Sequence, residues 1–278
     1  MPWVLRCRTG VLASSWPPRR ETADEGGSGL VEVMYSQETK VAGTMSGDWF
    51  QSDVFLVFDL ETTGVDVFSD RPVSYALMAM ASGDCVLESY SIVDPGMEVP
   101  ADAAAIHGIS TQMARRFGTG LEQALGAITD ALLRATREGW YVVGMNVGYD
   151  LTIVDSRCKE AYGVGLAELG FAAPVLDVLV LDRHYDRFRS GKRTLERLAE
   201  FYDVPAGNYH DALEDCRVTY RVLEAIVKRY PEVTGIEKAK VTETLGSYHR
   251  DWLESYRQWA TQRGREVKEF DGWPISVS

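Results

Sequence analysis

The sequence predicts an α/β fold in which a mixed β-sheet is flanked by helices. Three segments between residues 53 and 93 have the patterning of consecutive strands, a fourth apolar strand is expected at 140–145, and amphipathic stretches follow. Three sequential strands followed by strands that helices separate are typical of a mixed sheet with helices on its faces. The 278 residues are enough for one domain of ordinary size with extensions.

The first expected strand is the apolar run 54–58, which leads into the sequence DLETTG at 59–64. Side chains alternate between the two faces of a strand, so Asp59 and Glu61 project the same way. Two such carboxylates repel each other unless one is protonated or a cation lies between them. The pair therefore indicates Mg²⁺ or Mn²⁺. The alternative is a strand that ends in a polar turn, with a threonine as a helix cap and the glycine as the turn residue.

The next elements follow from periodicity. Residues 73–81 and 85–93 are expected to form the second and third strands, joined by a hairpin turn at Ser82-Gly83-Asp84. A helix is expected over 121–138, where leucine and isoleucine recur on one stripe, and a further helix over 194–202.

Two more acidic motifs lie at the starts of expected helices. The strand at 140–145 is followed by NVGYD at 146–150 and by an apolar-periodic stretch from Leu151 to Tyr162, which places Asp150 at a strand-to-helix junction. Further on, HDALED at 210–215 opens another helix. Because His210 precedes this helix and Asp215 lies about one and a half turns later, the imidazole and the carboxylate can reach one cleft.

In order and spacing these motifs resemble those of the DnaQ-like 3′→5′ exonucleases of the DEDDh subclass. The resemblance is based on Asp59 and Glu61 in DLETTG, Asp150 in NVGYD, and His210 with Asp215 in an H-x-A-x-x-D arrangement. It covers roughly residues 53–230 and includes IHGIS at 106–110, which is similar to an element of proofreading subunits. The DEDDy subclass has tyrosine four residues before the last acid, where this chain has Asp211, so the histidine subclass is favoured. The resemblance implies a ribonuclease H-like fold over 51–235.

The chemistry also follows from the residue types. Phosphodiester hydrolysis needs an activated water, neutralised phosphate oxygens and a stabilised leaving group, which two divalent ions about 3.5 to 4 Å apart supply when carboxylates hold them. His210, with an ordinary pKa near 6.5, is expected to be the general base; the alternative is a helix cap. The expected ligands of two Mg²⁺ or Mn²⁺ ions are Asp59, Glu61, Asp150 and Asp215.

The resemblance further implies a pocket for the terminal nucleotide, lined by Thr62, Thr63 and Val65, with His107 and Tyr149 beside it. Base stacking on an aromatic ring such as that of Tyr149 is worth about 1 to 3 kcal/mol. Tyr149 is equally an ordinary core residue type, and His107 fits a helix end as well as a binding site.

Other acids near these motifs are expected to be caps or surface charges: Asp155, Asp177, Asp211 and Glu214. A basic run lies between the second and third acidic motifs, and it is either a solvated face or a contact for the nucleic-acid backbone. Its members are Arg183, Arg187, Arg189, Lys192, Arg193 and Arg197. The net charge of −12 argues against extended phosphate binding, although metal ions would neutralise charge locally at a site that holds only a strand end.

Both ends of the chain differ from the middle. Residues 1–50 have little periodicity and are expected to be a disordered extension, in which Met45 is an alternative start of translation. Residues 236–278 are expected to form a helical tail with Leu245, Tyr248, Trp252, Tyr256 and Trp259 on one stripe. That stripe packs on its own domain or docks onto a polymerase or another replication partner.

The composition is typical of a cytoplasmic enzyme. The four cysteines are scattered without metal-ligand spacing, and no apolar run approaches the ~20 residues that span a bilayer, so we expect no membrane role. The glycine motifs of P-loop and Rossmann proteins are absent from the sequence.

The sequence therefore predicts a metal-dependent 3′→5′ exonuclease that releases nucleoside 5′-monophosphates from single-stranded or frayed DNA ends in proofreading or repair. The alternatives are an RNA substrate, as for ribonuclease T or oligoribonuclease, and a catalytically idle interaction module of a replication complex. Four converging acids have no use in a scaffold, which argues against the second alternative.

Overall fold

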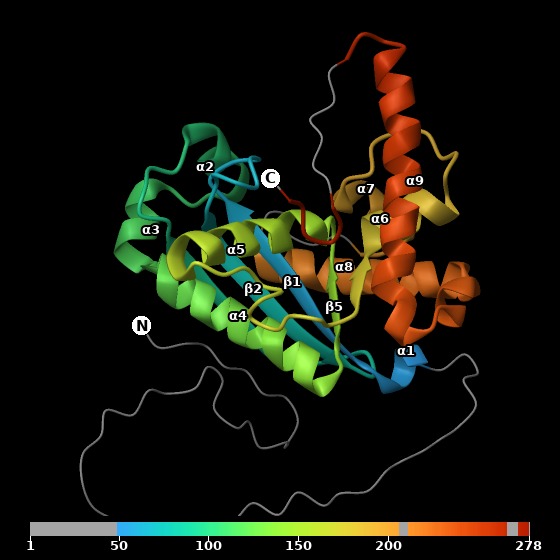
Figure 1. Ribbon diagram of the computed structural model, residues 1–278, viewed down its shortest axis with the longest axis horizontal. Coiled ribbons are helices and arrows are strands. Elements are labelled where there is room, and N and C mark those ends of the chain that lie inside the picture. Colours follow the sequence, from blue (N-terminus) through green and yellow to red (C-terminus); the bar gives the residue numbers. More distant parts are fainter. Residues whose placement is uncertain (1–48, 206–210, 266–271, 278) are drawn as a thin grey trace, which may run out of the picture.

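The computed structural model describes residues 49–205, 211–265 and 272–277. Their centre is a six-stranded sheet in the order β4-β3-β2-β1-β5-β6 (Figure 1). Neighbours β1, β2 and β3 pair antiparallel, whereas β5 pairs parallel with β1 and with β6, and β4 pairs parallel with β3. The mixed sheet flanked by helices is confirmed. The strands are β1 (Val54–Thr62), β2 (Pro72–Ala81), β3 (Asp84–Asp94), β4 (Thr119–Gly120), β5 (Tyr141–Gly144) and β6 (Val175–Asp177).

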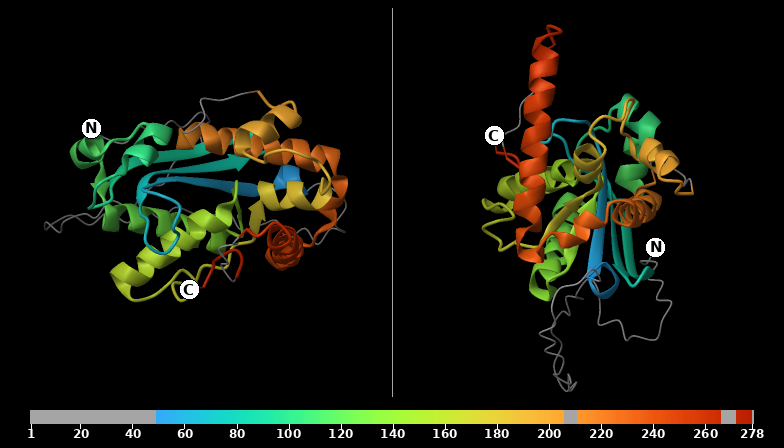
Figure 2. Two further views of the ribbon diagram at one scale, coloured as in Figure 1. Left: turned by 90° about the horizontal axis from the view of Figure 1, so that it is seen from above. Right: turned by 90° about the vertical axis from the view of Figure 1, so that its right-hand side faces the viewer.

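Helices lie on both faces of the sheet (Figure 2). Helix α4 has the bounds expected from its apolar stripe, while α2, α3, α6 and the short strands β4 and β6 were not expected individually. The helices described are α1 (Trp49–Ser52), α2 (Ala101–His107), α3 (Thr111–Phe117), α4 (Leu121–Glu138), α5 (Val147–Tyr162), α6 (Val178–Tyr185), α7 (Leu195–Phe201), α8 (Ala212–Arg229) and α9 (Val241–Thr261), with 3₁₀ turns at Pro231–Gly235 and Lys238–Lys240.

Alternation along β1 divides the core into two layers. Phe55 and Val57 belong to the layer that contains the buried residues of α8, α6 and α7. Leu56 and Phe58 belong to the layer under α4 and α5. Because the period of a strand is two residues, odd-numbered side chains of β1 face α8 and even-numbered ones face α5. The odd set continues into Asp59 and Glu61.

The N-terminal boundary of the packed region lies at α1. Phe50 contacts the tilted ring of Phe55 and stacks on Tyr220, with ring centroids 4.8 and 5.9 Å apart, so α1 belongs to the core. Met45 and the rest of the expected extension up to residue 48 lie outside the described residues. No helix in the described ranges is long and apolar enough to cross a membrane.

The C-terminal region contacts the domain at two places. The first half of α9 packs beside α6: Leu245 is buried, and the ring of Tyr248 stacks on His184 with centroids 3.4 Å apart. The second half extends past the sheet in Figure 1. Residues 272–277, the C-terminal strap, then return to α5, where the Ser276 N–H donates to Thr152 Oγ1 at 3.0 Å.

Candidate active site

Three acidic side chains from two elements converge at the end of β1. Asp59 and Glu61 extend from the face of β1 that is covered by α8, and Asp215 comes from the first turn of α8. One carboxylate oxygen from each lies within 4.8 Å of the others. Residues more than 150 positions apart therefore meet because α8 packs across the face on which the two strand acids project.

Asp150 approaches the same point from the other layer. It lies in the first turn of α5, is 4% exposed, and its Oδ1 accepts the Leu60 N–H at 3.2 Å. Leu60 is the residue between the two acids of β1, so this bond ties the helix to the acidic strand end. Strand β5 ends at Gly144, and Asn146, the N-cap of α5, has a left-handed conformation with φ of 62°; helix α5 therefore begins at Val147 rather than at Leu151.

Burial and mutual repulsion act together on these acids. Burial, followed by the charges of Asp150, Asp215 and Glu61, raises the pKa of Asp59 well above its ordinary value. Burial, followed by the charges of Asp215 and Asp211, raises the pKa of Glu61 to about 8. Burial also raises the pKa of Asp150. Glu61 therefore retains its proton at neutral pH unless a cation compensates its charge, and oxygen donors in this arrangement suit hard divalent ions.

The expected general base cannot be placed, because His210 lies outside the described residues. The next residue, Asp211, is the N-cap of α8: its Oδ1 accepts the N–H groups of Leu213 at 3.1 Å and Glu214 at 3.4 Å. Glu214 forms an ion pair with Arg217 at 2.5 Å. Both acids thus have the supporting roles expected for them.

Thr62, Val65 and Tyr149 lie together beside the acidic cluster. Thr62 Oγ1 donates to the Gly64 carbonyl at 2.8 Å and lies 2.8 Å from the Tyr149 hydroxyl, which also donates to that carbonyl. The network holds the Tyr149 ring against the turn that follows β1. Val65 is 83% exposed, so its side chain is available to a ligand.

Thr63 and His107 have contacts that serve the fold. Thr63 is 2% exposed; its hydroxyl donates to Asp70 Oδ1 at 2.6 Å and accepts the Arg71 N–H at 3.0 Å, which fixes the loop between β1 and β2. His107 is the last residue of α2, and its Nδ1 accepts the Ile109 N–H at 3.1 Å. A part in substrate binding stays a prediction for both residues.

Two of the remaining acids are buried rather than surface charges: Asp177 is the N-cap of α6, and Asp155 lies inside α5. Asp177 Oδ1 accepts the N–H groups of Asn146, Leu179 and Val180, and burial raises its pKa to about 6. Asp155 accepts the Leu166 N–H at 2.7 Å and pairs with Lys159 at 2.8 Å.

Two of the six residues of the basic run, Arg189 and Arg193, turn inward around an acid that the sequence did not single out. Asp182 is fully buried; Arg189 donates to both of its oxygens at 2.6 Å, Arg193 binds the same carboxylate, and the Tyr202 hydroxyl donates at 2.9 Å. The guanidinium of Arg183 lies 3.5 Å from the ring centre of Trp252 on α9. Arg197 makes only an exposed pair with Glu200, at 2.6 Å. The signal in the sequence was an aspartate inside the apolar stretch VLVLD, followed by arginines.

A match to a protein-family model identifies the family of this chain. A family model described as Exonuclease (RNase_T) matches residues 56–223, more than half of the chain. The chain belongs to this exonuclease family. The match contains all four acids of the site, from Asp59 to Asp215, and the resemblance to the DnaQ-like exonucleases is confirmed.

Similar proteins include polymerases that carry an exonuclease-like segment. The chain is 26% identical over 221 residues to DNA polymerase III PolC-type of Thermotoga maritima, covering 78% of this chain and 15% of that protein. It is 22% identical over 230 residues to the PolC-type polymerase of Bacillus subtilis, again covering 78% of this chain and 15% of that protein. This exonuclease chain therefore spans only about 15% of the length of the relatives it matches.

Solved structures show the same fold. E. coli exonuclease I in complex with a dA16 oligonucleotide superposes with a TM-score of 0.54 at 20% identity, over 66% of this chain and 42% of that chain. Exonuclease X in complex with 5′-overhanging duplex DNA superposes with a TM-score of 0.50 at 18% identity, over 69% of this chain and 99% of that chain. The ribonuclease H-like fold is confirmed.

Proposed function

We propose that this protein is a metal-dependent 3′→5′ exonuclease that hydrolyses the terminal phosphodiester bond of single-stranded DNA and releases nucleoside 5′-monophosphates. The observation that supports this most directly is the convergence of Asp59, Glu61 and Asp215 within 4.8 Å, with Asp150 bonded to the strand between the first two. The family and the polymerase relatives support a nuclease that acts on DNA.

The donor set fits divalent cations, because its acids repel one another and have raised pKa values. Two Mg²⁺ or Mn²⁺ ions held by Asp59, Glu61, Asp150 and Asp215 would neutralise the phosphate oxygens and the leaving group, and would favour ionisation of the attacking water. Tyr149 and Val65 would contact the terminal nucleotide, with Thr62 holding the tyrosine hydroxyl in place. His210 would accept the proton from the attacking water.

The cellular setting belongs to the same proposal. The PolC-type relatives suggest a cytoplasmic role in replication proofreading or repair, with residues 51–235 as the exonuclease domain and 236–278 as a tail. Leu245 of that tail is buried in the core layer under α8, so at least the first half of α9 supports the fold.

The test uses 5′-labelled single-stranded DNA and RNA with Mg²⁺, Mn²⁺ or EDTA. We expect native protein to shorten the labelled DNA stepwise with either ion and to be inactive in EDTA. Asp59→Asn and Asp215→Asn should each lower the rate more than about 100-fold, because a missing metal ligand costs more than a missing outer contact. Asp84→Asn is the matched control: it removes the same charge at the exposed β2–β3 turn and should keep native activity.

Two results would contradict the proposal. Laddering that survives both site substitutions would place the chemistry elsewhere. Release of the labelled mononucleotide as the first product would reverse the direction of digestion. Faster shortening of RNA than of DNA would correct the substrate and leave the site assignment intact.

A further inference from the structure

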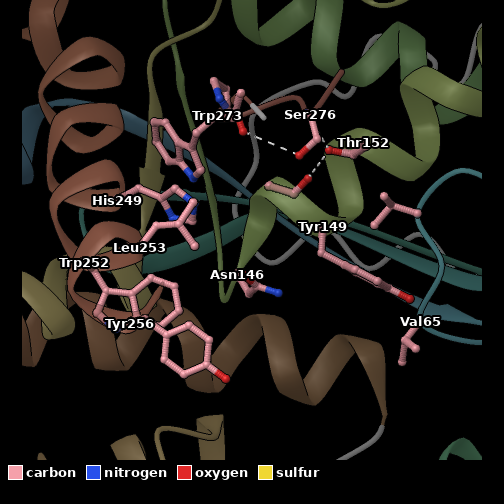
Figure 3. A pocket seen from close by; sticks show the side chains of 14 residues that line it. Val65, Asn146, Tyr149, Thr152, His249, Trp252, Leu253, Tyr256, Trp273 and Ser276 are labelled. Carbon is pink, nitrogen blue, oxygen red and sulfur yellow. Dashed lines mark hydrogen bonds between the residues drawn. The ribbon is translucent and has the colours of Figure 1, made fainter. Parts of the chain in front are cut away.

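A pocket of about 240 Å³ lies next to the acidic cluster, and the family match does not include all of its walls. One wall contains Val65 and Tyr149, the residues beside the candidate active site. The opposite wall is formed by α9 and by the C-terminal strap, as Figure 3 shows. The family match ends at residue 223, so the second wall is built by residues outside it.

The α9 residues that line the pocket lie on one face of the helix. His249, Leu253 and Tyr256 recur every three to four residues and thus share one face of the helix. The Trp273 ring of the strap lies beside them, nearly parallel to the His249 ring at a centroid distance of 6.4 Å. The lining is therefore mostly aromatic and aliphatic, which suits the faces of a nucleobase.

The strap holds this wall against α5 by close contact. A Cβ at Gly148 would meet the Pro274 carbonyl oxygen at 3.2 Å and the Trp273 ring at 3.3 Å, so glycine allows the strap to approach. Thr152 Oγ1 accepts the Ser276 N–H and donates to the Gly148 carbonyl at 2.5 Å. The pocket is thus formed before any ligand binds, which reduces the entropy lost on binding.

Asn146 and His249 bring polar side-chain groups to the lining of the cavity. The side-chain amide of Asn146 lies between the α9 wall and Tyr149 (Figure 3). Burial, and then the charges of Arg183 and Arg250, lower the pKa of His249 to about 4, so its imidazole is neutral at neutral pH. An amide and a neutral imidazole each offer a donor and an acceptor, which can pair with base edges.

The pocket adjoins a second groove that is lined in part by arginine side chains. Trp252 and Tyr256 line both cavities, and the second is also lined by Arg183 and Arg187. Arg187 is exposed and donates to Ser255 at 3.1 Å. A base in the first cavity would therefore leave its phosphate within the field of these arginines.

We propose that this pocket binds a base of single-stranded DNA upstream of the terminal nucleotide, and that α9 with the strap thereby extends the exonuclease site along the strand. The proposal rests on the proposed function. Tyr149 and Val65 belong both to this pocket and to the candidate active site. The occupant is therefore more consistent with the nucleic-acid substrate than with a protein partner.

The experiment compares two substrates and two variants of the full chain. One substrate is a thymidine decanucleotide; the other is the p-nitrophenyl ester of thymidine 5′-monophosphate, which has the terminal nucleotide and a p-nitrophenolate leaving group but no upstream base. Leu253→Glu puts a negative charge into the pocket, and Gln258→Glu puts the same charge on an exposed position of α9 outside it. Thermal unfolding of each variant is recorded in parallel.

We expect Leu253→Glu to lower kcat/KM for the decanucleotide about tenfold or more while its rate on the ester stays within about twofold of native. Gln258→Glu should stay within about twofold on both substrates. Unchanged decanucleotide hydrolysis by Leu253→Glu would overturn the proposal and leave the surface to a protein partner. An equal loss on both substrates would also overturn it, because the residue would then support the catalytic site itself. A native protein that hydrolyses neither substrate would refute the proposed function instead.

Crosslinking provides a readout that does not depend on a variant folding. Decanucleotides with one 5-iodo-2′-deoxyuridine at the second, third or fourth position from the 3′ end are irradiated with native protein in Ca²⁺. Crosslinks to His249, Trp252, Tyr256 or Trp273 from at least one position support the proposal. Crosslinks confined to other residues from all three positions contradict it.

Discussion

Two groups of buried acids in this molecule have opposite surroundings. Asp182 is fully buried, and two arginines and a tyrosine hydroxyl contact its carboxylate. Asp59 and Glu61 are partly buried among other carboxylates, which raise their pKa values. The difference teaches that burial alone does not mark a functional acid: an acid whose charge the fold compensates is structural, while acids gathered at a cleft, with pKa values that their mutual repulsion raises, are typical of a functional site.

The largest stability effect should come from the compensated acid. Asp182→Ala would leave Arg189 and Arg193 without their shared carboxylate, and breaking a buried pair in this way costs about 3 to 5 kcal/mol of unfolding free energy. Urea unfolding measures the change. Glu200→Ala, which removes the exposed partner of Arg197, is the control and should cost no more than about 1 kcal/mol. Equal effects of the two substitutions would remove the contrast on which the comparison rests.

Asp177 is an intermediate case, since backbone N–H groups rather than arginines surround it. Its pKa is raised from 3.8 to about 6, so the folded state holds the proton more tightly than the unfolded state. The resulting stability is fully present below pH 4 and is lost as the pH rises through 6, a change of about 3 kcal/mol.

Asp177→Asn keeps an acceptor for the N–H groups but cannot ionise. The difference in unfolding free energy between native protein and this variant should therefore shift by about 3 kcal/mol between pH 3 and pH 7, with native protein relatively less stable at pH 7. Denaturant unfolding at several pH values without divalent ions measures it. A constant difference across this range would show that Asp177 ionises normally.

Metal addition should affect only the uncompensated group. Mn²⁺ at 100 times its dissociation constant should stabilise native protein by about 2.7 kcal/mol and should leave Asp59→Asn nearly unchanged. Because the pKa of Glu61 is about 8, binding at pH 7 should also release protons. Calorimetry in two buffers of different ionisation enthalpy counts them. If Mn²⁺ raised the unfolding temperature of native protein and of Asp59→Asn equally, the ion would bind at another site.

Local pattern predicted much of the fold, and long-range packing decided the rest. The alternation that puts Asp59 and Glu61 on one face of β1 follows from the geometry of any strand. The contact between Asp150 and the Leu60 N–H spans 90 residues, and only the family resemblance indicated it. The sequence indicated that the basic run is exposed, because its local pattern does not reveal that Arg189 and Arg193 form ion pairs with the buried Asp182. The pocket beside Tyr149 went unpredicted because its second wall comes from α9 and the strap, over 90 residues later.

The alternation of β1 also limits how this chain can change over evolution. Its odd-numbered side chains belong to one layer and its even-numbered ones to the other, and the strand is paired on both sides. A single inserted or deleted residue before Asp59 would turn both acids toward α5 and bring the Leu60 side chain into the cleft. In lineages that descend from such a protein, β1 can therefore accept only replacements that conserve its length.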